Sequence, residues 1–138
     1  MVVVIDCNIF VMCLTSASPY HVIYQSLVGG KFELAITTDI MLEYEEVIQQ
    51  KYSTATASAF ITLLNELANV HYTHPSYQWQ LITADADDNK YCDCAIAGQA
   101  LYIVTEDRHF DVLKSIPFPA LTTVSIDGFL EILDMHAK

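Results

Sequence analysis

Acidic residues that follow two apolar runs are the first candidates for chemistry in this sequence. Asp6 directly follows the run Val2–Ile5, and Asp107 lies shortly after a second run, Tyr102–Val104. Both runs are typical of buried parallel strands, and an open α/β sheet binds its ligands at the carboxyl ends of its strands. Either Asp could instead cap the helix that follows it, so position alone leaves both roles open.

Glu43, on a predicted helix, is distinguished by the direction of its side chain. At about 100° per residue, Glu43 falls at the border of the arc formed by the apolar residues of its helix, whereas Glu45 and Glu46 point further away. A carboxylate that leans toward a core needs a partner, because burying a bare charge is very unfavourable. A partly exposed glutamate at the flank of the helix is the alternative.

Asp88 lies in a crowded acidic stretch but differs from its neighbours in phase. On the helix that opens at Asp85–Asp88, it falls on the core-facing side of the first turn, whereas Asp93 falls on the opposite side. Asp85 and Asp87 precede the helix, where acids favour the positive end of its dipole. Capping is the alternative for all three acids, but among them only Asp88 also faces the sheet.

Two strand ends and two helices thus each offer one inward carboxylate, and these are Asp6, Glu43, Asp88 and Asp107. Clusters that offer only oxygen ligands suit Mg²⁺ or Mn²⁺, and without a cation their mutual repulsion would raise their pKa values. The sequence has no Walker-type phosphate loop and no Ser or Cys nucleophile motif, and its histidines show no ligand spacing. Metal-assisted hydrolysis is the reaction class that fits.

The elements that must position these carboxylates alternate between strands and helices. Strands are predicted at Val2–Ile5, Phe32–Ile36, Val70–Tyr72, Tyr102–Val104 and Leu121–Val124. Helices are predicted from near Pro19 to Val28, from a cap at Thr38 or Asp39 to Lys51, from a cap at Ser53, from Asp85–Asp88 to Gly98, and from a cap at Asp127, with a short one possible at Phe110–Lys114. This alternation predicts an α/β fold whose parallel sheet is covered on both faces.

The composition is that of a folded domain. The chain has 138 residues, of which 53% are hydrophobic and 17% charged, which is enough for one domain with a core and excludes a disordered chain. No apolar run is long enough to span a bilayer, and the N-terminal MVVVID lacks the basic start of a signal peptide. We therefore expect a single domain over residues 1–138, with no membrane contact and a cytoplasmic location.

The four cysteines are Cys7, Cys13, Cys92 and Cys94. Without a secretory signal a disulfide framework is not expected. Cys92 and Cys94 are only two residues apart and have no histidine close by in sequence, whereas a zinc site would need a wider spacing and a second pair of ligands. We interpret all four as small apolar side chains.

The charge balance is strongly acidic. The formal net charge is −11, from 17 acids against six basic residues that are scattered along the chain. Non-specific binding of nucleic acid needs clustered Lys and Arg, so nothing in the composition points to RNA. A bound divalent cation would offset part of the excess acid locally.

Three segments resemble the PIN-domain family. VVVIDCNIF resembles its opening strand, in which an Asp is followed two residues later by Asn or Thr, and FELAITTDIMLEYEEV resembles the strand and helix that carry its Glu. DADDNKYCDCAIAGQALYIVTEDRHF resembles its C-terminal signature, where an acid opens a helix, Gly98 ends it, and a strand leads to T-x-D. The resemblance covers about residues 2–134 and is closest to the VapC-related toxins of bacterial toxin–antitoxin systems, of which DDNKYCDCA is typical.

The resemblance implies a three-layer α/β/α sandwich with a mainly parallel sheet and a Mg²⁺- or Mn²⁺-dependent endoribonuclease that cleaves RNA. It also implies inhibition by a cognate antitoxin protein and, commonly, a homodimer. Carried over to this chain, it assigns the metals to Asp6, Glu43, Asp88 and Asp107, with Asn8 and Thr105 supporting them by hydrogen bonds. Arg108 would contact phosphate or is simply a surface arginine. Asp93 stays open, because some relatives have an acid there but its phase points away.

Two other classes compete with a ribonuclease. The first is a catalytically silent PIN-fold module that binds proteins, against which the four intact carboxylates argue. The second is a phosphotransfer domain, either a receiver or a haloacid-dehalogenase-like phosphatase. The phosphatase motif needs D-x-D, whereas this chain has Asp6-Cys7-Asn8, and the lysine that a receiver needs is missing after Tyr102–Val104 and Leu121–Val124.

Overall fold

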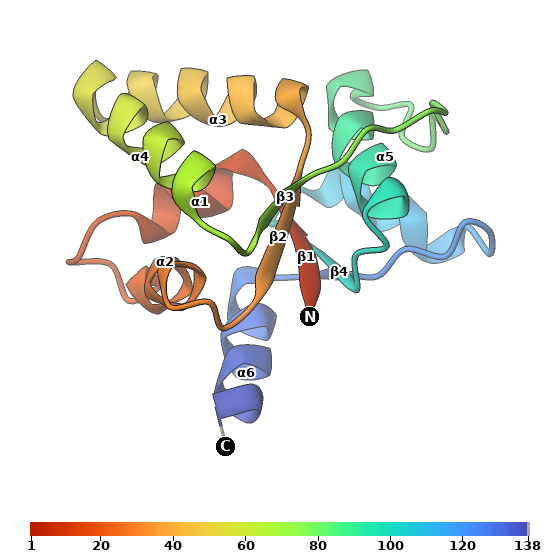
Figure 1. Ribbon diagram of the computed structural model, residues 1–138. Helices are drawn as coiled ribbons and strands as arrows, with labels where there is room; N and C mark the ends of the chain where they lie inside the picture. The colour runs from red at the N-terminus through yellow and green to blue at the C-terminus, as the bar shows by residue number, and fades with distance from the viewer. Residues whose placement is uncertain (138) are drawn as a thin grey trace.

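A parallel five-stranded sheet lies at the centre of the computed structural model, which describes residues 1–137 (Figure 1). Its strands are β1 (Val2–Ile5), β2 (Glu33–Ile36), β3 (Val70–Tyr72), β4 (Tyr102–Val104) and β5 (Thr123–Val124), in the order β3-β2-β1-β4-β5. All neighbouring strands are parallel. β1 takes the central place because its apolar, β-branched residues can be covered on both faces, and Val3, Val4 and Ile5 are fully buried.

Helices cover both faces of this sheet. They are α1 (Cys7–Cys13), α2 (His21–Val28), α3 (Thr38–Lys51), α4 (Thr54–Glu66), α5 (Asn89–Ala97) and α6 (Ile126–Ala137), with 3₁₀ turns η1 (Ala86–Asp88) and η2 (Arg108–Ser115). Figure 1 shows α1 to α4 on one side of the strands and α5 on the other, where α5 packs against β1, β2 and β4. The predicted three-layer α/β/α sandwich is confirmed.

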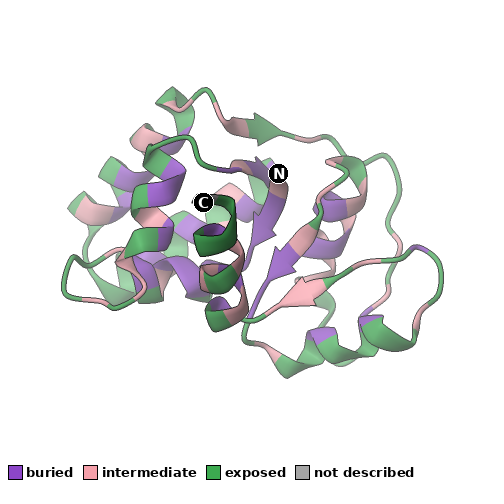
Figure 2. Ribbon diagram, turned by 90° about the horizontal axis from the view of Figure 1, so that it is seen from below, coloured by how far each residue is buried: buried purple, intermediate pink, exposed green. Residues whose placement is uncertain are grey.

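The core has an aromatic cluster on each side of the sheet. Phe10, Tyr44 and Phe60 pack together where α1, α3 and α4 meet, and the rings of Tyr91 and Phe110 contact each other on the α5 side. All five are buried, and burying a side chain of this size contributes roughly 1.5–3 kcal/mol. Figure 2 shows buried residues in the central strands β1, β2 and β4 and on the inward sides of the helices, whereas β3 and β5 have none.

The helix caps partly follow the sequence. Ser53 caps α4 as predicted, since its hydroxyl accepts a hydrogen bond from the Thr56 N–H. The prediction of Thr38 or Asp39 for α3 was wrong by one position, because Thr37 accepts from the Ile40 N–H. The prediction of Asp127 for the last helix was also wrong: α6 already begins at Ile126, and Ser125 accepts from the Gly128 N–H.

Two elements differ in kind from the prediction. α1 was not among the predicted helices, because its seven residues are too few to show a helical period. Asp6 stands at its N-cap position, but its side chain makes no cap hydrogen bond. The short helix expected at Phe110–Lys114 is the longer 3₁₀ turn η2, which buries Phe110 and Leu113. In the described part of the chain, every helix falls short of the length and apolar character that crossing a bilayer requires.

Candidate metal centre and active site

Asp6 is a buried carboxylate at the carboxyl end of the central strand. It is only 4% exposed and does not cap α1, so the capping alternative does not hold for this residue. β4 runs beside β1 with Ile5 paired to Val104, and this register places Thr105 next to Asp6. The Thr105 hydroxyl donates to Asp6 Oδ2 at 2.9 Å. Burial raises the pKa of Asp6. The hydrogen bond from Thr105 opposes this rise, and the charges of Glu43 and Asp107 add to it.

Asp107 is connected to Asp6 through the same threonine. The Asp107 N–H donates to Thr105 Oγ1 at 3.0 Å, so one hydroxyl joins the two acidic positions. Asp107 also caps η2, because its Oδ1 accepts from the His109 N–H at 2.9 Å. Asp107 therefore both caps η2 and belongs to the acidic cluster, two roles that the sequence had left as alternatives.

Asp88 carries a buried oxygen with no donor. Its side chain makes no cap for α5, and its Oδ2 accepts no hydrogen bond from residues 1–137. The imidazole of His109 lies nearby, with its Nδ1 3.5 Å from Asp88 Oδ2 and 3.4 Å from Asp107 Oδ1. Burial raises the pKa of Asp88 to about 7, and the charges of Asp107, Asp85 and Asp6 act in the same direction.

Glu43 completes the cluster from α3. The fully buried Tyr44 donates its hydroxyl to the Ile5 carbonyl at 2.5 Å, which fixes α3 against the end of β1 and brings Glu43 beside Asp6. Both Glu43 oxygens have donors from α5: Lys90 Nζ lies 2.6 Å from Oε2, and the Tyr91 hydroxyl donates to Oε1. Burial alone would raise the pKa of Glu43, but these hydrogen bonds outweigh it and hold the pKa below its ordinary value.

Asp6 and Glu43 lie close together, Thr105 links Asp6 to Asp107, and His109 Nδ1 lies within 3.5 Å of both Asp107 and Asp88. Ligand atoms of Asp6, Cys7 and Glu43 lie within 4.8 Å of one another, and so do those of Asp85, Asp88 and His109. Burial and the neighbouring acids raise the pKa of the Cys7 thiol, so it stays protonated and does not suit a hard cation. The possible metal ligands that remain are carboxylate oxygens and one imidazole.

The other predicted residues lie around this cluster or away from it. Asn8 is exposed, and within residues 1–137 its side chain hydrogen-bonds to no carboxylate, unlike Thr105. Arg108 is exposed and lines a cavity of about 250 Å³ that also includes Asp107. Asp93 accepts the Trp79 N–H at 3.1 Å and so anchors the segment before α5, in agreement with its outward phase.

Three residues that contact the carboxylates were not predicted from the sequence, and these are Lys90, Tyr91 and His109. The inward phase of Tyr91, three residues after Asp88, was a usable signal for a residue near the cluster. His109 could have been noticed as the second residue after Asp107. Lys90 carried no such signal, because its partner Glu43 lies 47 residues away in the chain.

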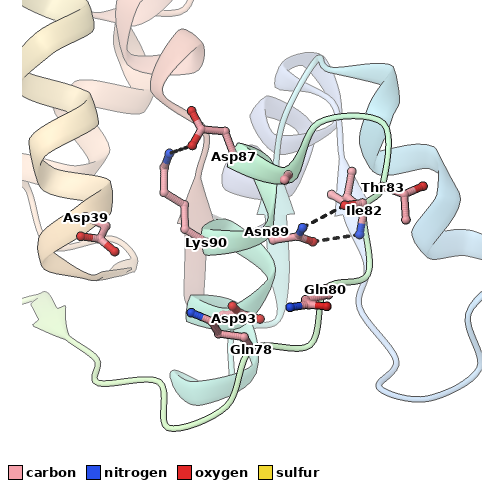
Figure 3. Close-up of a pocket in the computed structure, with 10 residues that line it drawn as sticks. Asp39, Gln78, Gln80, Ile82, Thr83, Asp87, Asn89, Lys90 and Asp93 are labelled. Atoms are coloured by element: carbon pink, nitrogen blue, oxygen red, sulfur yellow. Dashed lines mark hydrogen bonds and ion pairs between the residues drawn. The ribbon is translucent and has the colours of Figure 1, made fainter.

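A polar cavity of about 610 Å³ lies beside the cluster (Figure 3). Its lining includes Lys90, Gln78, Gln80 and Asp93, and Figure 3 shows Lys90 reaching from α5 toward Asp87. The wall before α5 is held by Asn89, whose side-chain amide exchanges two hydrogen bonds of 2.8 Å with the backbone of Ile82. The cavity is large enough for part of a polar substrate and meets the cluster at Lys90.

The sequence matches a known protein family over most of its length. The PIN domain model matches residues 2–109, which is most of the chain, and the protein therefore belongs to the PIN domain family. PIN domains are generally nucleases, so the class of protein defined here is a PIN-type nuclease fold with an acidic cluster. No curated protein matches the sequence significantly.

Solved structures share the fold at low sequence identity. A chain of VapBC2 from Rickettsia felis bound to a DNA fragment from their promoter matches with a TM-score of 0.61 and 17% identity, covering 91% of this chain and 98% of that one. A chain of VapBC-1 from nontypeable Haemophilus influenzae matches with a TM-score of 0.62 and 15% identity, covering 92% of this chain and 99% of that one. The RRP44 PIN domain of T. brucei matches with a TM-score of 0.51 and 12% identity, covering 99% of this chain and 82% of that one.

Proposed function

We propose that this protein is a divalent-metal-dependent endoribonuclease that hydrolyses RNA phosphodiester bonds, with Asp6, Glu43, Asp88 and Asp107 as its catalytic carboxylates. The observation that carries the proposal is the buried oxygen of Asp88, which has no donor among residues 1–137 and lies 3.5 Å from His109 Nδ1, which is itself 3.4 Å from Asp107. A buried carboxylate oxygen is unfavourable without a partner, and a cation at this place would supply one.

The residues of the cluster fit Mg²⁺ or Mn²⁺. Both ions prefer oxygen ligands, and the cluster offers carboxylates from two strand ends and two helices. Asp6, Asp88 and Asp107 would hold the ion, and Glu43 has a ligand atom within 4.8 Å of one of Asp6. Thr105 holds Asp6 in orientation, as residues around metal ligands commonly do.

The proposed reaction is attack of water on a phosphodiester. A bound divalent ion would lower the pKa of a coordinated water and offset charge on the phosphate. Thr105 fixes the Asp6 carboxylate, and the η2 cap fixes Asp107. The cavity lined by Lys90, which contacts Glu43, would give the RNA chain a place near the carboxylates. Because water attacks, the RNA 2′-hydroxyl is not required, and the products would carry a 3′-hydroxyl and a 5′-phosphate.

We further propose that the protein acts as the toxin of a toxin–antitoxin pair in the cytoplasm. Support comes from the PIN family match and from the shared fold with chains of two VapBC structures. The expected partners are a cognate antitoxin protein, which would inhibit cleavage, and a second copy of the chain in a homodimer. Arg108, exposed beside Asp107, is the proposed phosphate contact.

The test is an RNA-cleavage assay with the purified protein in Mg²⁺, in Mn²⁺ and in EDTA, beside Asp6→Asn. We expect cleavage with either ion, none in EDTA, and none by Asp6→Asn with its fold intact by circular dichroism. Asp111→Asn is the matched control, since Asp111 is exposed and pairs with Lys114 on the surface. Unchanged RNA after long incubation with Mn²⁺ would favour a silent binding module, and an Asp6→Asn protein as active as wild type would refute the site.

A further inference from the structure

Lys90 is the cation built into one end of the carboxylate cluster. Its Nζ lies 2.6 Å from Glu43 Oε2, 3.7 Å from Asp87 Oδ1 and 5.7 Å from the centroid of the Tyr91 ring. The Lys90 and Glu43 side chains are 19% and 22% exposed, so their pair is sheltered from water, whereas Asp87 is 82% exposed and adds little. The ammonium group is therefore a fixed positive charge at Glu43.

Tyr91 completes the same arrangement. Its hydroxyl donates to the other Glu43 oxygen and accepts the Cys7 N–H at 3.3 Å. Glu43 thus has a donor on each oxygen, and both donors come from adjacent residues of α5. A divalent ion at Glu43 would have to displace the ammonium of Lys90 or stay in contact with it, and two cations in contact repel each other.

The opposite end of the cluster lacks such a charge. Asp88 Oδ2 is buried and has no donor among residues 1–137, and His109 Nδ1 lies 3.5 Å from it. The same His109 Nδ1 lies 3.4 Å from Asp107 Oδ1, and the Thr105 hydroxyl bonds to both Asp6 and the Asp107 N–H, so these three acids are connected through two side chains. Negative charge without a fixed counter-charge is thus concentrated on Asp6, Asp88 and Asp107.

We propose that the ammonium group of Lys90 takes the place of a second cation at Glu43, so that the cluster binds one divalent ion, held by Asp6, Asp88 and Asp107. This role of Lys90 rests on the metal site proposed above. It makes Lys90 a positioning residue, which holds Glu43 and sets how many ions bind. The same ammonium lines the polar cavity, so it also presents positive charge to a phosphate entering there (Figure 3).

The test counts Mn²⁺ ions per chain, by isothermal titration calorimetry and by the electron paramagnetic resonance signal of free Mn²⁺. Wild type is expected to bind one ion. Lys90→Met and Lys90→Gln are expected to bind two, because each removes the charge from Glu43, and Gln keeps a hydrogen-bond donor if Met impairs folding. Lys90→Arg keeps the charge and should bind one, and Lys90→Met combined with Glu43→Gln should return the count to one.

Lys114→Met is the matched control, because Lys114 pairs with Asp111 at 3.6 Å on the exposed surface and its loss should leave the count at one. Two ions in wild type, or one ion in a folded Lys90→Gln protein, would overturn the role of Lys90. Cleavage of RNA by a wild-type protein that binds two ions would overturn this role and leave the proposed function standing. If the wild type binds one ion but does not cleave RNA, the proposed function would be overturned and the role of Lys90 would stand.

Discussion

Glu43 and Asp88 are carboxylates of similar burial at two ends of one cluster, with side chains 22% and 13% exposed. Glu43 receives hydrogen bonds on both oxygens, and its pKa lies below the ordinary value. Asp88 has a buried oxygen to which no residue in 1–137 donates, and burial raises its pKa to about 7. Similar chemical groups at similar depth therefore have opposite electrostatic environments.

The difference arises within the first turn of α5. Asp88, Lys90 and Tyr91 are close in sequence, but the helix directs Lys90 and Tyr91 to Glu43 on α3 and directs Asp88 to the end of β4. One helix start thus neutralises an acid on one side and contributes an uncompensated acid on the other. Burial alone does not determine the role of a carboxylate here, because the position of the nearest fixed cation decides which end needs an ion.

Replacing Asp88 should give the largest effect on activity. Asp88→Asn removes a ligand from the uncompensated end, and we expect RNA cleavage to fall by about 100- to 1000-fold, the range seen when a key electrostatic group is lost. Initial rates at saturating Mn²⁺ measure this. Glu45→Gln, on the exposed side of α3, is the control and should stay within about twofold of wild type. Wild-type cleavage by Asp88→Asn would remove the distinction between the two ends.

The pH dependence of stability should show the same contrast without any substrate. The folded protein holds the Asp88 proton up to about pH 7, whereas the unfolded chain releases it near pH 4. In EDTA, the free energy of unfolding should therefore fall as the pH rises from about 4 to about 7, by up to about 4 kcal/mol at about 1.4 kcal/mol per pKa unit. The contribution of Glu43 to the free energy of unfolding has the opposite sign. Because the folded pKa of Glu43 is lowered, its contribution is lost only as the pH falls below the ordinary range of a glutamate.

Urea unfolding in EDTA at a series of pH values measures this slope. Asp88→Asn should make it less steep and leave the smaller part that Asp6 contributes, because the pKa of Asp6 is also raised. Mn²⁺ should restore stability near pH 7 by binding the folded state. An Asp88→Asn protein with the same slope as wild type would show that another group is responsible.

Removing the Tyr91 hydroxyl, which bonds to Glu43, should have a smaller effect on stability. Tyr91→Phe leaves one oxygen of Glu43 and the Cys7 N–H without their partner, so we expect a loss of about 1–2 kcal/mol in the free energy of unfolding. Tyr102→Phe on β4 is the control, because the Tyr102 hydroxyl bonds to no residue that the structure describes. Equal stability of Tyr91→Phe and wild type would contradict the hydrogen-bonding described for Glu43.

The smallest effect is expected at Asp93, which lies outside both ends. Asp93→Asn keeps an acceptor for the Trp79 N–H, so cleavage should stay within about twofold and stability within about 1 kcal/mol of wild type. Initial rates and urea unfolding measure both. A loss as large as that of Asp88→Asn would place Asp93 among the ion-binding residues.

Much of the frame of the site was predictable from local patterns. The apolar runs predicted β1 and β4, and their parallel pairing places Asp6 near Asp107. Helical phase separated Glu43 from its exposed neighbours and Asp93 from the cluster, because one turn of helix relates sequence position to direction. These inferences need only a few neighbouring residues each.

The pairing within the cluster was not predictable in this way. Lys90 and Glu43 lie 47 residues apart, and their contact depends on how α3 and α5 meet across the end of β1. The buried Tyr44, which fixes α3 to the Ile5 carbonyl, gave only an apolar signal in the sequence. Such contacts depend on tertiary packing, so the sequence could nominate the four carboxylates but could not show that their two ends differ.

Anomalous X-ray diffraction from crystals grown with MnCl₂ tests the difference between the two ends most directly. The account predicts one manganese peak, about 2.0–2.2 Å from carboxylate oxygens of Asp6, Asp88 and Asp107, with Lys90 still in contact with Glu43. A peak bound to Glu43 with Lys90 displaced, or crystals with no peak in the cluster, would contradict it.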